Sequence, residues 1–250
     1  MNCCSSVDEQ IGACLATAAE IRMPAGVRRD QRGRLLRGYL HKSSNSLCGI
    51  KGYASLIAGG PGATSRATAW ARKIVAEVEQ LEDMYRSVRD MAFPVPAPNL
   101  GAHDLATVVA DAVDSAAARH ANLRAGPFPL VAGDLLLPAG DLHQILAEIL
   151  DNSAESRQAL VEVTLTVCAG DAGRLALAIA DDGPGMPREL LAQAIDPFVT
   201  TRPGHLGIGL ARVDTIMDMH GLGWGLRSVP DHGTTVTVEV ARPRTGGRRP

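Results

Sequence analysis

Two long apolar seams joined by a short turn constrain the fold of this 250-residue chain more than any other feature. Residues 30–58 and 65–92 each repeat apolar side chains in steps of three and four, which is typical of helices that pack along a seam. Gly59-Gly60-Pro61-Gly62 between them favours a tight turn. The sequence therefore predicts an antiparallel helical hairpin. Its seam residues are Leu36, Leu40, Leu47, Ile50, Ala54 and Ile57, then Trp70, Ile74, Val78, Leu81, Tyr85 and Val88.

One hairpin cannot bury both seams, whereas two hairpins from two chains bury them in a four-helix bundle. Gly38, Gly49 and Gly52 weaken the first helix by roughly 1 kcal/mol each relative to alanine, so this helix depends on tertiary packing. We therefore expect a homodimer formed through residues 30–92.

The pattern changes after the proline-rich stretch 93–99, which we interpret as a linker. Beyond it, residues 100–241 alternate between helical and strand-like periodicity, which favours an α/β two-layer sandwich. The expected helices are 103–120, 139–159 and 207–220, and the expected strands are 161–168, 175–181, 223–229 and 234–241.

The two ends of the chain carry weaker signals. Ser6 and Glu9 form a capping-box pattern before apolar residues at helical spacing, so a helix is expected over 6–22. Residues 1–29 then form a helix and linker, too short for an ordinary sensor domain. The basic, glycine-rich residues 242–250 are expected to be a disordered tail.

Composition narrows the function classes. Hydrophobic residues make up 46% of the chain but aromatic residues only 3%, so the core is aliphatic. The net charge of −2 gives no nucleic-acid footprint. No apolar run reaches the length of a membrane span, and no secretory signal is evident. The five irregularly spaced cysteines fit neither zinc nor disulfide templates, so we expect a cytoplasmic protein with reduced thiols.

Two motifs carry polar side chains beside a helix or a strand end. Glu148 and Asn152 are four residues apart on one helical face, and their oxygens suit Mg²⁺, which takes few protein ligands. Asp181-Asp-Gly183-Pro-Gly185 directly follows a strand, where its glycines permit a tight turn and close approach of a ligand. Each motif alone also fits an ordinary helix or turn.

Two further motifs follow along the chain. Residues 196–210 combine Thr201, Arg202 and a glycine run before a helix, whose first N–H groups and dipole attract phosphate. His220-Gly221 precedes a strand, and Gly233-Thr-Thr235 opens the last one.

In this order and spacing, the four motifs resemble the N, G1, F and G2 boxes and the terminal Gly-Thr of bacterial sensor histidine kinases, in the GHKL ATPase superfamily. The resemblance covers about residues 100–241. It implies that ATP and Mg²⁺ bind here. The roles it implies are Mg²⁺ ligation by Asn152, adenine recognition by Asp181 with Gly183, Gly185 and Thr234, and phosphate or lid contacts by Thr201, Arg202, Gly207, Gly209 and Leu210.

The hairpin then resembles the phosphoacceptor box of the same kinases, on residues 40–57. The resemblance implies that His41 accepts the phosphoryl group and that Asn45, one turn on, contributes to phosphatase chemistry. Two departures are visible. His205 and Leu206 replace residues of the usual glycine run, and Lys42 stands where relatives carry a carboxylate that takes the histidine proton. We interpret Lys42 as a solvated helix charge, and Glu148 as a conceivable replacement base.

The leading hypothesis is a dimeric histidine kinase that phosphorylates His41 from ATP and passes the phosphoryl group to an aspartate of a response-regulator receiver domain. Three alternatives stay open. One is a histidine phosphotransfer or phosphatase protein with weak kinase activity. Another is a GHKL ATPase or serine kinase regulator, with Glu148 activating water or Ser43 and Ser44 as acceptors. The last is a non-enzymatic scaffold.

Overall fold

The computed structural model describes residues 19–23, 31–59, 64–92, 104–127, 133–169 and 173–243. The chain divides into two compact units. The unit that we call the hairpin unit comprises Arg29–Val95 and Asp196–Ala211. The other, the sheet unit, comprises Met1–Arg28, Pro96–Ile195 and Arg212–Pro250. The predicted hairpin boundaries, residues 30 and 92, lie within three residues of the ends of the first segment of the hairpin unit. The segment 196–211, which was expected in the ATP-binding domain, instead belongs to the hairpin unit.

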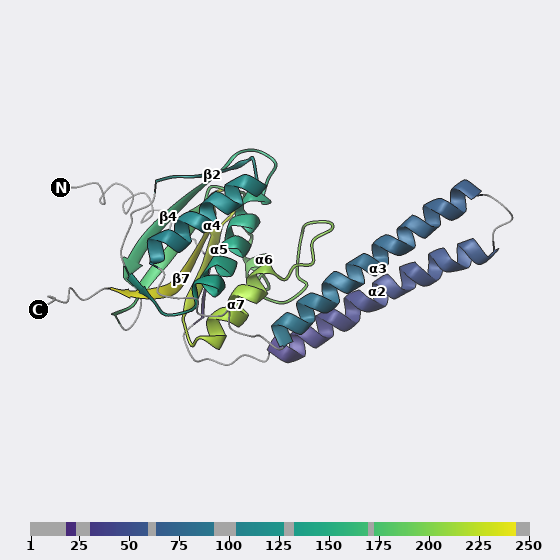
Figure 1. Ribbon diagram of the computed structural model, residues 1–250, viewed down its shortest axis with the longest axis horizontal. Helices are drawn as coiled ribbons and strands as arrows, with labels where there is room; N and C mark the ends of the chain where they lie inside the picture. Colours follow the sequence, from purple (N-terminus) through teal and green to yellow (C-terminus); the bar gives the residue numbers. More distant parts are fainter. Residues whose placement is uncertain are drawn as a thin grey trace, which may run out of the picture. The chain divides into compact units, whose positions relative to one another are not determined.

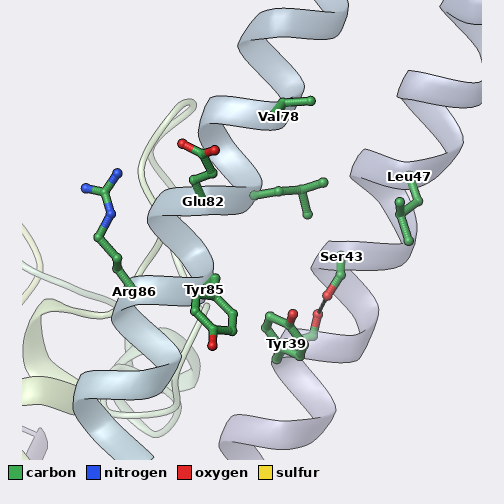
Figure 2. A pocket seen from close by; sticks show the side chains of 8 residues that line it. Tyr39, Ser43, Leu47, Val78, Glu82, Tyr85 and Arg86 are labelled. Atoms are coloured by element: carbon green, nitrogen blue, oxygen red, sulfur yellow. Dashed lines mark hydrogen bonds between the residues drawn. The ribbon is translucent and has the colours of Figure 1, made fainter.

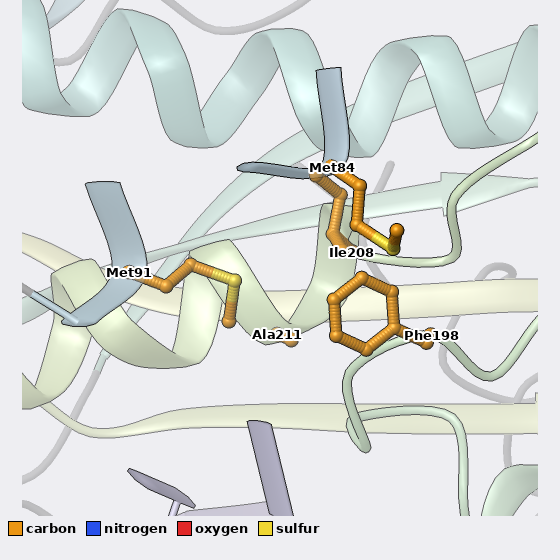
Figure 3. Close-up of a cluster of buried hydrophobic side chains, with 5 residues drawn as sticks. All are labelled: Met84, Met91, Phe198, Ile208 and Ala211. Atoms are coloured by element: carbon orange, nitrogen blue, oxygen red, sulfur yellow. The ribbon is translucent and has the colours of Figure 1, made fainter. Parts of the chain in front are cut away.

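Two long helices make up most of the hairpin unit. Helix α2 (Gln31–Gly59) and helix α3 (Thr64–Ala92) pack side by side, close to the predicted ranges (Figure 1). At one end they pack against the segment 196–211 through a buried apolar cluster (Figure 3). This cluster consists of Met84, Met91, Phe198, Ile208 and Ala211.

Several seam residues of the hairpin are exposed in the single chain. Leu47 is 58% exposed and Tyr85 is 60% exposed. A groove of about 430 Å³ runs between the helices, where the rings of Tyr39 and Tyr85 lie in the space between α2 and α3 (Figure 2). The groove is lined by Tyr39, Ser43, Leu47, Val78, Leu81, Glu82, Tyr85 and Arg86.

The described strands of the sheet unit form one seven-stranded sheet, in the order β1-β6-β7-β5-β4-β2 with β3 also on β7. Among the strands that the structure describes, only the β2–β4 pair is parallel. The strands are β1 (Ala19–Met23), β2 (Leu123–Ala125), β3 (Gly133–Leu135), β4 (Val161–Ala169), β5 (Leu175–Asp181), β6 (Trp224–Val229) and β7 (Gly233–Pro243). The helices are α4 (Leu105–Arg119), α5 (Ala139–Ala154), the short α6 (Arg188–Leu191) and α7 (Gly209–Met219), whose first three residues fall in the hairpin unit.

Side-chain alternation explains the two layers. In β4, Val161, Val163 and Leu165 are buried while Glu162 and Thr164 are exposed, so one face of the sheet is covered and the other is open. Helices α4 and α5 cover the first face (Figure 1). Their buried sides are apolar, and Leu142, Leu146 and Leu150 of α5 are fully inaccessible. The expected α/β two-layer sandwich is confirmed.

The predicted helix over 6–22 is wrong at its C-terminal end, because Ala19–Met23 is a strand; residues 6–18 lie outside the described ranges. This segment pairs antiparallel with β6, with Ile21 opposite Leu226. Glu20 and Arg22 alternate with apolar residues and form an ion pair, and Glu20 also pairs with Arg227 of β6. Backbone pairing with a distant strand thus overrides the local helical spacing.

Two further boundaries differ from expectation. Helix α5 ends at Ala154 rather than near residue 159, because the Asn122 amide donates to the carbonyls of Ala154 and Arg157 at 2.8 and 3.1 Å. The expected tail at 242–250 begins later, since Arg242 and Pro243 belong to β7 and pair with β3. Residues 244–250 and the predicted linker 93–99 lie outside the described residues.

Candidate nucleotide and phosphoacceptor site

The carboxylate of Asp181, at the end of β5, is fixed by three donors. The backbone N–H groups of Gly183 and Thr234 donate to its Oδ1 at 2.9 and 3.1 Å, and the Ser153 hydroxyl donates to Oδ2 at 3.0 Å. Desolvation by burial raises the pKa of Asp181, and the three hydrogen bonds partly offset this effect. The result is an oriented carboxylate suited to accept from an amino group.

The turn after Asp181 and the start of β7 each require a glycine. Gly185 has φ +64°, and a Cβ there would lie 2.0 Å from the carbonyl oxygen of Val229. Gly233 has φ +92°, and a Cβ there would lie 1.8 Å from the carbonyl oxygen of Asp181. The backbone at residues 185 and 233 can therefore pack this closely around the end of β5 only because both residues lack a side chain.

Two hydrogen-bonded hydroxyl groups, one on β6 and one on β7, support this turn. The hydroxyls of Ser228 and Thr234 lie 2.9 Å apart, and the Ser228 hydroxyl accepts from the N–H of Met186 at 2.8 Å. The sequence motif singled out Thr234 but not Ser153 or Ser228. The burial of both serines depends on contacts between distant elements, so no local pattern indicated them.

Glu148 and Asn152 lie one turn apart on α5, as predicted. The Glu148 carboxylate forms an ion pair with the Arg212 guanidinium on α7, and both side chains are about one-fifth exposed, at 22% and 23%. The Nε atom of Arg212 is buried without a hydrogen-bond partner. Arg212 was missed by sequence reasoning, since it lies 64 residues from Glu148. This pair joins the helix of the proposed metal ligand to the helix that follows the glycine run.

The residues around Asn152 are compatible with Mg²⁺. No group of three histidine, cysteine or acidic side chains that would hold a metal is found among the described residues. Mg²⁺ does not need such a cage, because it binds through one or two protein oxygens together with phosphate and water. Asn152 carries a side-chain amide oxygen on this face of α5, which is a ligand type that Mg²⁺ takes.

The glycine segment 196–211 forms a closed loop within the hairpin unit. The N–H of Phe198 donates to the carbonyl of Gly207 at 2.7 Å and closes its neck. Gly207 has φ +69°, and a Cβ there would meet the Val199 carbonyl oxygen at 2.5 Å. Thr201 is exposed, Arg202 is partly buried, and Gly209 and Leu210 open α7.

The predicted nucleotide residues therefore fall into two groups. Asn152, Asp181, Gly183, Gly185 and Thr234 belong to the sheet unit, where Asp181, Gly183 and Thr234 are in direct contact. The residues of the hairpin unit are Thr201, Arg202, Gly207, Gly209 and Leu210.

Helix α2 carries the predicted phosphoacceptor, although the side chain of His41 lies outside what the structure describes. Asn45, one turn on, is exposed. The interpretation of Lys42 as a solvated charge is wrong. Its Nζ lies 3.4 Å from the carbonyl oxygen of Leu206 and 6.0 Å from the centroid of the Phe198 ring, and desolvation lowers the pKa of Lys42.

The strand-end carboxylate, the glycine turn and the helix carrying Asn152 lie together in the sheet unit. Residues 139–244 match the model of the family described as "Histidine kinase-, DNA gyrase B-, and HSP90-like ATPase".

The curated proteins to which the chain is similar include bacterial sensor histidine kinases. The chain is 28% identical over 214 residues to the sensor histidine kinase ZraS of Klebsiella oxytoca, which covers 82% of this chain and 45% of that protein. The chain thus spans about half the length of this curated relative.

Two solved structures share the fold. The histidine kinase AdeS of Acinetobacter baumannii matches 80% of this chain and 97% of its own, with a TM-score of 0.57 and 17% identity. Full-length ShkA in complex with AMPPNP matches 84% of this chain and 46% of its own, with a TM-score of 0.54 and 19% identity. Within the described ranges, no helix combines the length and apolar character needed to cross a bilayer.

Proposed function

We propose that this chain is a protein-histidine kinase that binds Mg-ATP and phosphorylates its own His41. The observation that carries the proposal is the oriented carboxylate of Asp181, with its three donors and its glycine turn, in a domain that matches the model of the histidine kinase-like ATPase family. In this proposal Asp181 accepts from the adenine amino group, and Thr201, Arg202, Gly207, Gly209 and Leu210 contact the phosphates.

The chemistry is a phosphoryl transfer. An imidazole nitrogen of His41 forms a bond to the γ-phosphorus while the bond to the β–γ bridging oxygen breaks and ADP leaves. Mg²⁺, held through Asn152, neutralises phosphate charge when it is bound. Arg202 adds a second positive charge near these oxygens.

The nitrogen proton must pass to a base or to water. Lys42 does not accept it while charged. Glu148 is the candidate base, and the ion pair with Arg212 keeps its carboxylate in place between α5 and α7.

The second step passes the phosphoryl group from His41 to an aspartate of a receiver domain on a separate response regulator, with release of the free imidazole. Asn45 is exposed on α2, where a docked partner reaches it. In a separate phosphatase reaction it orients water at the partner's phospho-aspartate, which releases inorganic phosphate and free aspartate. The exposed seam of the hairpin supports a homodimer. Because ATP and the receiver are intracellular, the proposed site of action is the cytoplasm.

The test is transfer of γ-labelled phosphate from Mg-ATP to the purified chain. We expect label on the wild type, none on His41→Ala, and strongly reduced label on Asn152→Ala. Nucleotide binding without label on the wild type would exclude the kinase. A panel of receiver domains, added to the labelled chain, identifies the partner of the second step.

A further inference from the structure

Helix α2 approaches the glycine loop so closely that only glycine fits at the contact. A Cβ on Gly38 would lie 2.4 Å from Cδ2 of Phe198 and 3.1 Å from the carbonyl oxygen of Pro197. Phe198 is itself 8% exposed and has φ +68°, a backbone conformation that costs energy for a residue with a side chain. The surrounding contacts must therefore hold Phe198 in place.

Lys42 meets the same loop one helical turn later. Residues four apart share a helix face, so Gly38 and Lys42 lie one above the other. The Lys42 ammonium donates to the Leu206 carbonyl at 3.4 Å and lies 6.0 Å from the centroid of the Phe198 ring. Partial burial at this contact lowers the pKa of Lys42.

Gly38 and Lys42 contact the neck of the loop, where its two ends meet, rather than its tip. The loop is closed by a backbone hydrogen bond of 2.7 Å from the N–H of Phe198 to the carbonyl of Gly207. Phe198 and Leu206, the contacts of Gly38 and Lys42, lie at this hydrogen bond. On the α3 side, Met84 and Met91 complete the cluster with Phe198, Ile208 and Ala211 (Figure 3). The neck is thus fixed to the hairpin from both helices.

We propose that Gly38 and Lys42 form a seat on α2 that holds the neck of the loop 198–207 and positions the glycine segment for phosphoryl transfer to His41. This inference rests on the proposed kinase function. His41 lies between the two seat residues in the sequence, on the same helix. Lys42 is then a positioning residue that acts through the loop, which accounts for a lysine beside the phosphoacceptor.

The first test replaces glycines on the same helix. Gly38→Ala introduces a Cβ into the Phe198 ring, whereas Gly52→Ala is a matched control because no heavy atom lies within 4 Å of its Cβ position. We expect Gly38→Ala to speed amide hydrogen exchange at Phe198 by about tenfold or more, measured without nucleotide. We expect its rate of His41 labelling to fall by about tenfold or more, as misplacement of reacting groups implies.

The second test replaces lysines. Lys42→Met removes the charge from the seat, and Lys73→Met is the matched control, since the Lys73 ammonium lies 5.1 Å from the centroid of the Tyr53 ring on the hairpin and not on the loop. We expect faster exchange at residues 198–208 and slower labelling only for Lys42→Met, with partial recovery in Lys42→Arg. The nucleotide dissociation constant should change by a smaller factor than the labelling rate, because the Asp181 site is untouched.

Unchanged exchange at 198–208 in Gly38→Ala and Lys42→Met would overturn the seat. Labelling that stays constant or accelerates in these variants would overturn its positioning role. If the wild type itself failed to label His41, both the proposed function and the positioning role would be wrong. The exchange rates at residues 198–208 would still test whether Gly38 and Lys42 hold the loop.

Discussion

The carboxylate of Asp181 is oriented before any nucleotide arrives, since its partners are two backbone N–H groups and one buried hydroxyl. Partners of this kind do not rearrange easily, so the group is pre-organised to accept a hydrogen bond. Its raised pKa also makes its charge sensitive to moderate acidity.

Replacing Asp181 by asparagine should weaken ATP binding by about 10- to 100-fold, the usual value of a hydrogen bond to a charged group. In the wild type, affinity should fall as the pH drops through the raised pKa of Asp181, at a higher pH than for an ordinary aspartate. Asp181→Asn should lose this pH dependence. Calorimetric titration with ATP over a pH series measures both effects; a variant with wild-type affinity and pH profile would exclude Asp181 from nucleotide recognition.

The ion pair of Glu148 and Arg212 predicts strong coupling between two substitutions. Either Glu148→Gln or Arg212→Met leaves one partly buried charge uncompensated and should destabilise the fold by about 1–2 kcal/mol, less than for a fully buried pair. The double variant should be nearly as stable as the wild type. Urea unfolding of the four proteins measures this, and simple additivity of the two losses would contradict the pairing.

Local motifs predicted Asp181, its glycines and Asn152, because each is part of a short segment whose chemistry is readable along the chain. Arg212, Ser153 and Ser228 were not predictable. Their roles depend on partners brought close only by the fold, such as Arg212 and Glu148 on different helices. Lys42 was misinterpreted for the same reason, because Leu206 contacts it from 164 residues away.

At the scale of elements, strand β1 extends the sheet beyond the edge expected from the sequence. It pairs with β6 along five residues, and Glu20 pairs with Arg227 across the two strands at 2.9 Å. The hydrogen bond from Arg227 and then that from Arg22 lower the pKa of Glu20. The stabilisation is therefore present above the ordinary glutamate pKa and is lost as the pH falls through the lowered value.

Charge reversal tests this strand pairing. Glu20→Lys and Arg227→Glu should each destabilise the sheet unit by about 0.5–1 kcal/mol, a small value because both side chains are about one-third exposed. The double reversal should restore part of the loss. Amide exchange of β6 residues, compared at neutral and acidic pH, measures the effect. Equal exchange rates in all variants would show that the Glu20–Arg227 ion pair does not stabilise the pairing of β1 with β6.

The periodicity of apolar residues predicted the long helices and strands but not the short strands. Helices α2, α3 and α5 and strands β4, β5 and β7 start within two residues of their predicted positions. Strands β2 and β3 are three residues each and carry no periodicity, and β1 exists through pairing with a distant strand. Local sequence patterns do not encode such pairings.

At the scale of the whole molecule, the exposed seam of the hairpin predicts self-association. Leu47→Asp with Val78→Asp places charges in the groove between α2 and α3 and should convert a dimer to a monomer (Figure 2). Gln80→Asp is the control, since this exposed position lies off the seam. Light scattering after size exclusion measures the mass. A wild type that is monomeric at all concentrations, or a doubly charged variant that stays dimeric, would contradict the bundle.

The division of the predicted nucleotide residues between the two units has one consequence for activity. Residues expected at the adenine belong to the sheet unit, while the glycine loop belongs with the helix of His41. Binding and transfer should therefore be separable by mutation, with Asp181 variants losing affinity and Gly38 or Lys42 variants losing rate.

The most direct measurement is the identity of the phosphorylated residue after incubation with Mg-ATP, found by mass spectrometry of peptides kept at neutral pH. We expect one phosphoryl group on the peptide that contains His41, lost after brief acid treatment and absent in Asp181→Asn at limiting ATP. An acid-stable phosphoryl group on Ser43 or Ser44, or ATP hydrolysis with no modified peptide, would contradict it.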